Sequence, residues 1–188
     1  MKPTIEAAFA ATPRRNFLPP ELAHAATQNV ALPIGYGQTN SQPETVQYML
    51  KWLDVKPADK VLDVGSGSGW TSALLSYLVG PDGQVIAVEI IPELVKISRS
   101  NCAKLGIRNV KFHQAGATLG WQAEAMYDKI LVSAATDHLP QSLLDQLRLG
   151  GRMVIPINQS IMIVDKDEQG NIEQVEKPGF VFVPLIDS

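Results

Sequence analysis

Two periodicities of apolar and polar residues alternate along the chain from residue 60 onward. Short runs rich in valine, isoleucine and leucine, typical of buried strands, are separated by stretches whose apolar residues recur at helical spacing. The pattern predicts strands at 60–64, 85–88, 110–113, 129–133 and 152–157, and helices at 71–79, 92–105 and 139–147. Such alternation indicates a Rossmann-like α/β fold, in which helices cover both faces of a mostly parallel sheet.

Glycine and proline mark the ends of the predicted helices. The segment 80–83 is expected to close the first helix, Gly106 the second and Gly150-Gly151 the third. The tail has a different pattern, with apolar runs at 160–165 and 180–185 on either side of a polar turn at 167–171. These runs predict two strands that add an antiparallel edge to the sheet.

Residues 1–42 precede this alternating region and are interrupted by several prolines. They are expected to form an N-terminal arm, irregular or partly helical, and the loop that leads into the core at 43–188. A helix is predicted to follow Pro43, with an apolar stripe from Val46 to Leu53 that belongs to the core. With 188 residues, of which 45% are hydrophobic, the chain is expected to be a single domain.

The strongest chemical signal is the run Gly65-Ser66-Gly67-Ser68-Gly69, which directly follows a predicted strand. Glycine accepts positive φ and lets a ligand approach bare backbone, so three glycines in five residues predict a nucleoside-binding loop. The dinucleotide fingerprint G-x-G-x-x-G is not met, because Trp70 stands where its last glycine would be. The loop therefore favours S-adenosylmethionine over a nicotinamide or flavin cofactor.

Two acidic residues accompany the loop. Asp63 lies two residues before the first glycine and is expected to brace it, whereas Glu89 ends the next strand, where α/β folds place a carboxylate that binds ribose hydroxyls. The plainer alternatives are an ordinary glycine-rich turn and an exposed acid at a strand end. The occurrence of all three features in one strand-loop-helix-strand unit favours a binding site.

Composition narrows the class of protein. The formal charge of −3 gives no field that would attract nucleic acid, and Arg14-Arg15, the one adjacent basic pair, is interpreted as a solvated surface pair. A single cysteine and three scattered histidines predict neither a disulfide framework nor a metal site. No long apolar segment suggests a membrane span or a signal peptide, so a cytoplasmic protein is expected.

Several motifs together resemble one enzyme family. They are the segments 13–19, 32–43, 65–69, 120–121, 127–132, 150–156 and 182–185. In these segments the chain resembles the protein-L-isoaspartate (D-aspartate) O-methyltransferases, and Leu-Pro-Ile-Gly-x-Gly-Gln-Thr-x-Ser at 32–41 is the most specific of them. The resemblance implies methyl transfer from S-adenosylmethionine to L-isoaspartyl, and more weakly D-aspartyl, residues of damaged proteins, by a monomer.

The resemblance also implies roles for individual residues. Ile90 would pack on the adenine of the cofactor, with Ala115 and Gly116 beside it, and Gln38 and Thr39 would shape the substrate side. The chain departs from the family at several places, among them Thr27 and the segment 133–138, and two of these departures bear most directly on the site. Gly116 stands where the family has an aspartate that holds the adenine amino group, and Asn29 stands where it has another aspartate.

Ser41 has two interpretations. It matches the active-site serine of the family, but Ser41-Gln42-Pro43-Glu44 also reads as a capping box, with Ser41 as the N-cap of the following helix. Two further functions stay open at this point. One is a methyltransferase of the same fold that acts on a small molecule or RNA, and the other is a non-catalytic protein that binds S-adenosylmethionine.

Overall fold

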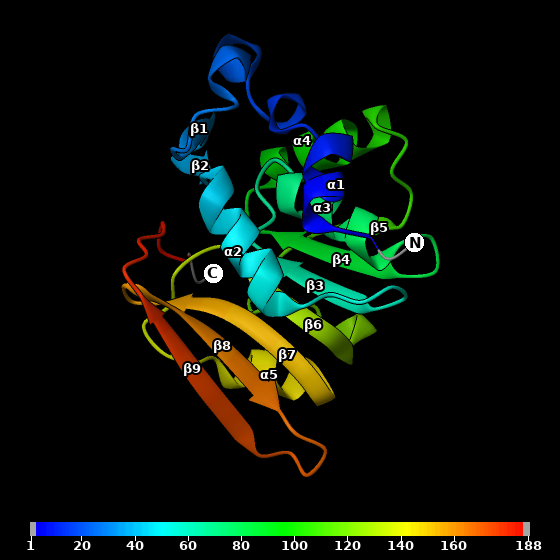
Figure 1. The fold of residues 1–188 in the computed structure, drawn as a ribbon, viewed down its shortest axis with the longest axis vertical. Helices are drawn as coiled ribbons and strands as arrows, with labels where there is room; N and C mark the ends of the chain where they lie inside the picture. Colours follow the sequence, from blue (N-terminus) through cyan, green and yellow to red (C-terminus); the bar gives the residue numbers. More distant parts are fainter. Residues whose placement is uncertain (1–2, 186–188) are drawn as a thin grey trace.

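The computed structural model describes residues 3–185. A seven-stranded sheet has the order β5-β4-β3-β6-β7-β8-β9, in which β5 to β7 are parallel and β8 and β9 are antiparallel (Figure 1). The strands are β3 (Lys60–Val64), β4 (Gln84–Glu89), β5 (Val110–Gln114), β6 (Tyr127–Val132), β7 (Leu147–Ile157), β8 (Ser160–Lys166) and β9 (Ile172–Pro178). The predicted parallel sheet with an antiparallel edge is confirmed.

Helices pack on both faces of this sheet. One buried cluster joins the sheet to the first four helices, and a second joins the opposite face to α5 and to the segment 115–125. The helices are α1 (Ile5–Ala11), α2 (Pro43–Leu53), α3 (Trp70–Val79), α4 (Pro92–Lys104) and α5 (Gln141–Gln146), with short 3-10 turns η1 (Arg14–Phe17), η2 (Pro20–Ala25) and η3 (Gln122–Glu124). The apolar stripe of α2 is buried, as expected.

The segment that leads into α2 is a hairpin. Strands β1 (Leu32–Gly35) and β2 (Gln38–Asn40) pair antiparallel, with Leu32 opposite Asn40. Tyr36 at the tip has a φ of 55° and is flanked by two glycines whose φ is also positive, which makes the tight reversal possible. The hairpin therefore carries Gln38 and Thr39 on a paired strand that ends next to Ser41.

The tail differs from the expected pattern in one strand. The last strand is β9 at 172–178, directly after the polar turn, and not 180–185. β9 is charged and largely exposed because it lies at the edge of the sheet, where it pairs along one side with β8. The apolar segment 180–185 forms only one bridge, from Pro184 to Ala135. Phe180 and Phe182 pack against the core, Val181 is exposed, and residues 183–185 line the pocket described below.

The end of α5 also differs. The helix stops at Gln146, and Gly150-Gly151 lie inside β7, where the register against β6 shifts. A Cβ at Gly151 would lie 2.8 Å from the carbonyl oxygen of Arg148. The two glycines thus lie at an irregularity of strand β7, and they do not terminate a helix.

The N-terminal segment is packed onto the core. Ala8 of α1 is fully buried, the Phe9 ring meets Trp70 edge-on at 5.3 Å, and the indole N–H of Trp70 donates to the carbonyl oxygen of Thr12. α1 lies beside α3 in the fold (Figure 1). The predicted arm is therefore part of the hydrophobic core.

Candidate active site

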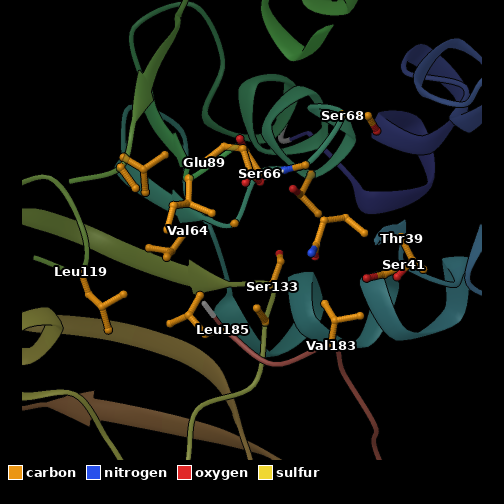
Figure 2. Close-up of a pocket in the computed structure, with 18 of the residues that line it drawn as sticks. Thr39, Ser41, Val64, Ser66, Ser68, Glu89, Leu119, Ser133, Val183 and Leu185 are labelled. Atoms are coloured by element: carbon orange, nitrogen blue, oxygen red, sulfur yellow. Dashed lines mark hydrogen bonds between the residues drawn. The ribbon is translucent and has the colours of Figure 1, made fainter. Parts of the chain in front are cut away.

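A pocket opens at the carboxyl ends of β3, β4 and β6, between the glycine-rich loop and the β1-β2 hairpin (Figure 2). This is the edge at which parallel α/β sheets bind ligands. Ten of the twelve predicted site residues line it, namely Gln38, Thr39, Ser41, Gly65, Ser66, Gly67, Glu89, Ile90, Ala115 and Gly116. Asp63 and Gly69 do not.

The glycine-rich loop is held from behind by strand β4. The N–H groups of Gly65 and Ser66 both donate to the carbonyl oxygen of Val88, at 2.9 and 3.1 Å. The carboxylate of Glu89 accepts from the N–H of Gly67 at 2.9 Å and from the N–H of Ile91 at 3.0 Å. Glu89 is buried and lines the pocket, so a single carboxylate both orders the loop and faces the pocket.

Asp63 and Gly69 support the loop from outside the pocket. One oxygen of Asp63 accepts from the hydroxyls of Thr71 and Ser72, at 2.9 and 2.6 Å, which ties the end of β3 to the first turn of α3. Burial raises the pKa of Asp63 to about 6, although the two hydroxyls oppose this and Glu89 adds to it. A Cβ at Gly69 would lie 2.9 Å from that of Ser98, so this glycine lets α3 and α4 approach closely.

Two buried oxygens in this region have no hydrogen-bond partner within residues 3–185. They are Oγ of Ser66, which lines the pocket, and Oδ1 of Asp63. Buried polar atoms are normally paired, so an unpaired hydroxyl at a pocket wall indicates a polar ligand. The bare backbone of the loop, the Ser66 hydroxyl and the Glu89 carboxylate fit a hydroxyl-bearing and amine-bearing nucleoside such as S-adenosylmethionine.

The opposite end of the pocket is small and largely apolar. It is formed by Ile90 and by the segment 115–120, in which Thr118 has the only polar side chain. A Cβ at Gly116 would meet nothing within 4 Å, so this wall is open where the backbone turns past the sheet. Such a wall suits a flat heterocycle that stacks on aliphatic side chains.

The structure excludes one of the two interpretations of Ser41, its role as a helix cap. The N-cap of α2 is Gln42, and Pro43 and Glu44 are the first two helical residues, so the capping-box prediction is wrong. The cap comes from Asn29, whose side-chain oxygen accepts the N–H of Glu44 at 3.0 Å and whose amide donates to the Glu44 carboxylate at 2.7 Å. The Ser41 side chain lies at the pocket beside Thr39 (Figure 2).

Arg14 corrects a second prediction. It was expected to be a solvated surface residue, but its side chain is 5% exposed and donates six hydrogen bonds to the segment 26–41, while Arg15 alone is exposed. Sequence reasoning missed it because five of its six acceptors are main-chain carbonyls, which any sequence supplies. The Pro-Arg motif at 13–14 was the available signal.

The tail supplies a wall that the sequence did not indicate. Val183, Pro184 and Leu185 line the pocket. Figure 2 shows Val183 and Leu185 on the side opposite Glu89 and Ser66. A second, adjoining hollow is formed by the segment 179–183 together with Thr39, Ser41 and Thr45. Ser41 lies on the boundary of both hollows, so its hydroxyl can meet a ligand from either side.

Two further searches cover the part of the chain that the structure describes. In it, no helix is long and apolar enough to cross a membrane. Nor do any three histidine, cysteine, aspartate or glutamate side chains in residues 3–185 gather as metal ligands would. The buried Cys102 is a free thiol on α4.

A family model and the related proteins carry the same family description. The model of the family described as protein-L-isoaspartate (D-aspartate) O-methyltransferase matches residues 1–188. A protein-L-isoaspartate O-methyltransferase of Methanopyrus kandleri is 46% identical over 179 residues, which cover 93% of this chain and 79% of the relative. One of Methanothrix thermoacetophila is 43% identical over 182 residues, which cover 95% and 86%.

Solved structures agree with these relatives. A protein-L-isoaspartate O-methyltransferase superposes with a TM-score of 0.85 at 28% identity, over 96% of this chain and 60% of that chain. A Plasmodium falciparum protein solved in complex with S-adenosyl-L-homocysteine superposes with a TM-score of 0.83 at 23% identity, over 98% of this chain and 90% of that chain, and shares the fold.

Proposed function

The chain belongs to the protein-L-isoaspartate (D-aspartate) O-methyltransferase family, and from that premise we propose how its pocket performs the family's reaction. It is an S-adenosylmethionine-dependent methyltransferase that esterifies isoaspartyl carboxylates of damaged proteins and so begins their repair. The proposal assigns the residues that bind the cofactor and those that orient the substrate.

The cofactor side consists of the glycine-rich loop and the carboxylate beside it. S-adenosylmethionine supplies, when bound, a methyl group on a positively charged sulfur. Glu89 would accept ribose hydroxyls, Ile90 and the backbone of Ala115 and Gly116 would border the adenine, and the unpaired Ser66 hydroxyl would bind a polar group of the cofactor. The single observation that carries the assignment is that these residues and Ser41 line one pocket.

The substrate side consists of Gln38, Thr39 and Ser41. A carboxylate with a pKa of roughly 4 is already ionised at neutral pH, so the nucleophile needs no general base. What the chain must do is hold that carboxylate in line and remove its water. The Ser41 side chain makes no hydrogen bond within residues 3–185, so its hydroxyl is available to donate to the carboxylate.

A methylation assay tests this function. Purified protein is incubated with labelled S-adenosylmethionine and matched peptides that contain either L-isoaspartyl or L-aspartyl. Methyl ester on the isoaspartyl peptide alone is the expected result. Transfer to a small molecule or RNA, or binding of S-adenosylhomocysteine with no transfer to any acceptor, would contradict the proposal and favour the alternatives named above.

Ser41→Ala tests the role of the hydroxyl. We expect kcat to fall by about 10 to 100-fold, because one orienting hydrogen bond in the transition state is lost, while the Kd of S-adenosylhomocysteine stays unchanged. Ser100→Ala, at an exposed position on α4, is the matched control. A Ser41→Ala enzyme with full activity would remove this residue from the mechanism.

Gly67→Val tests the cofactor loop. Gly67 has a φ of 52°, and a Cβ there would lie 3.1 Å from Cδ1 of Ile34, so valine would both strain the loop and fill the pocket wall. We expect calorimetry to detect no binding of S-adenosylhomocysteine while circular dichroism shows an intact fold. Wild-type affinity in a folded variant would refute the assignment of the loop.

We further propose that the protein works as a monomer in the cytoplasm without a nucleic-acid or membrane partner. The net charge of −3 and the free, buried Cys102 support this. Light scattering on the purified protein and fractionation of the source cells are the direct measurements.

A further inference from the structure

The side chain of Arg14 binds main-chain carbonyls of the segment 26–41, which contains the β1-β2 hairpin at one wall of the pocket. Its terminal nitrogens donate to five carbonyl oxygens in the segment 26–41, which belong to Ala26, Gln28, Val30, Asn40 and Ser41. The bond to the Ser41 carbonyl is 3.0 Å long, and the bond to Val30 is 2.8 Å. One guanidinium thus fixes both the start of the hairpin and the residue that follows it.

Side-chain hydrogen bonds also connect Arg14 to the glycine-rich loop. Its Nε donates to Oδ1 of Asn40 at 2.8 Å, and Nδ2 of Asn40 donates to the hydroxyl of Ser68 at 3.3 Å. The carbonyl oxygen of Ser68 in turn accepts from Asn101 on α4 at 3.1 Å. Asn40 and Ser68 are both buried, so this path is shielded from water. It joins the substrate wall of the pocket to the glycine-rich loop.

Arginine is needed for this arrangement. Its planar fork offers five donors in fixed directions, whereas lysine offers one compact charge that cannot reach all of these acceptors. Within residues 3–185 no carboxylate forms an ion pair with Arg14, and its guanidinium lies over the Trp70 ring, 5.5 Å from the centroid. Burial lowers the pKa of Arg14 to about 10, which still leaves it protonated at neutral pH.

The two walls depend on Arg14 to different degrees. The cofactor loop has its own supports, because Gly65 and Ser66 bond to Val88 and Gly67 bonds to Glu89. The segment between η2 and α2 contains only a short hairpin, and Arg14 bonds to it at both ends. Removal of the guanidinium should therefore displace Ser41 and leave the cofactor loop in place.

We propose that Arg14 is a positioning residue that sets the separation between Ser41 and the glycine-rich loop, and with it the alignment of the acceptor carboxylate with the methyl group. Arg14 does not line the pocket, so it acts through Asn40 and Ser41. The inference rests on the proposed function, because it concerns the substrate side of that same site.

Arg14→Lys tests the proposal, with the exposed Arg15→Lys as its matched control. Isoaspartyl-peptide methylation is measured at saturating S-adenosylmethionine, and the Kd of S-adenosylhomocysteine is measured by calorimetry. We expect kcat/KM for the peptide to fall by about 30-fold or more, since a misplacement of one ångström costs on the order of 100-fold. The Kd should stay within about three-fold of the wild type, and Arg15→Lys should match the wild type in both.

Two results would overturn the proposal. One is peptide kinetics of folded Arg14→Lys equal to those of Arg15→Lys. The other is an equal loss of cofactor affinity and peptide turnover, which would indicate a general structural role. A wild-type protein that methylates no isoaspartyl peptide would refute the proposed function and this inference together, whereas an active wild type with an unaffected variant refutes the inference alone.

Asn40→Ala keeps the proposal testable if Arg14→Lys does not fold. This variant removes the side-chain link to Ser68 and leaves the five carbonyl bonds of Arg14. We expect the same split, with a lower kcat/KM for the peptide and an unchanged Kd of S-adenosylhomocysteine. Wild-type peptide kinetics in folded Asn40→Ala would contradict the proposed path between the two walls.

Discussion

Gly116 is a position at which a substitution should strengthen cofactor binding. It stands where the family pattern has an aspartate, its φ is not in the left-handed region, and a Cβ there would meet nothing within 4 Å. Gly116→Asp should add a carboxylate that accepts from the adenine amino group. Because a hydrogen bond to a charged group contributes about 1.5 kcal/mol or more, we expect the Kd of S-adenosylhomocysteine to fall about ten-fold by calorimetry.

Gly116→Ala is the matched control, because it adds the Cβ without the carboxylate. Its Kd should equal that of the wild type. If Gly116→Asp binds S-adenosylhomocysteine no more tightly than Gly116→Ala, the adenine does not lie at this wall, and the orientation proposed for the cofactor is wrong.

Asp63 should make stability depend on pH. Its pKa of about 6 in the folded protein lies above the value of about 4 expected in the unfolded chain, so the folded state binds the proton more tightly. This contribution to stability is fully present below about pH 4 and is lost as the pH rises to about 6. Urea unfolding of wild type and Asp63→Asn should show the wild type losing on the order of 3 kcal/mol relative to the variant across that window.

The exposed Asp82→Asn is the control for this titration. The prediction is wrong if the difference in unfolding free energy between wild type and Asp63→Asn is constant from pH 4 to pH 7, or if it grows in favour of the wild type. Either result would show that burial does not raise the pKa of Asp63.

Local chemistry explains which residues could be predicted from the sequence. The glycine-rich loop and Glu89 were predictable because both positions are set by adjacent strands, and the structure places both at the pocket. Arg14 and Asn29 were not, because their partners lie 12 to 27 positions away and are mostly main-chain atoms or a helix end. Which carbonyls surround an arginine depends on the folded path of the chain.

At the scale of elements, the start of α2 depends on one remote side chain. Asn29 satisfies the N–H of Glu44, the second residue of the helix, and no side chain within α2 does so. Asn29→Ala should lower the free energy of unfolding by about 1 kcal/mol, the usual loss for an N-cap. Denaturant unfolding measures it, with the neighbouring exposed Gln28→Ala as control. Equal stabilities of the two variants would show that Asn29 does not cap the helix.

Elements were predictable where burial governs their pattern. The strands from β3 to β8 and the helices between them carry apolar side chains at strand or helix spacing. Their order along the chain was therefore predicted correctly. β9 was missed because an edge strand such as Ile172–Pro178 needs only backbone pairing, and its charged residues give no apolar signal. The apolar segment 180–185 suggested a strand, although its phenylalanines are apolar because they pack on the core and residues 183–185 because they line the pocket.

At the scale of the whole molecule, we propose that the N-terminal segment and the core form one domain. Ala8 on α1 is fully buried and lies in the hydrophobic cluster that contains Trp70 and Leu74 of α3. A carboxylate placed there would be buried without a partner, which costs several kcal/mol. Ala8→Asp should therefore lower the melting temperature of the entire protein in one transition and reduce methylation above it.

Ala10→Asp provides the comparison, because Ala10 lies on the same helix but is exposed. It changes charge and helix propensity in the same way and should leave the melting temperature nearly unchanged. If α1 were an independent arm, Ala8→Asp would instead detach it while the core still melted at the wild-type temperature. Calorimetric scans of both variants distinguish these outcomes, since a single domain shows one cooperative peak that moves as a whole.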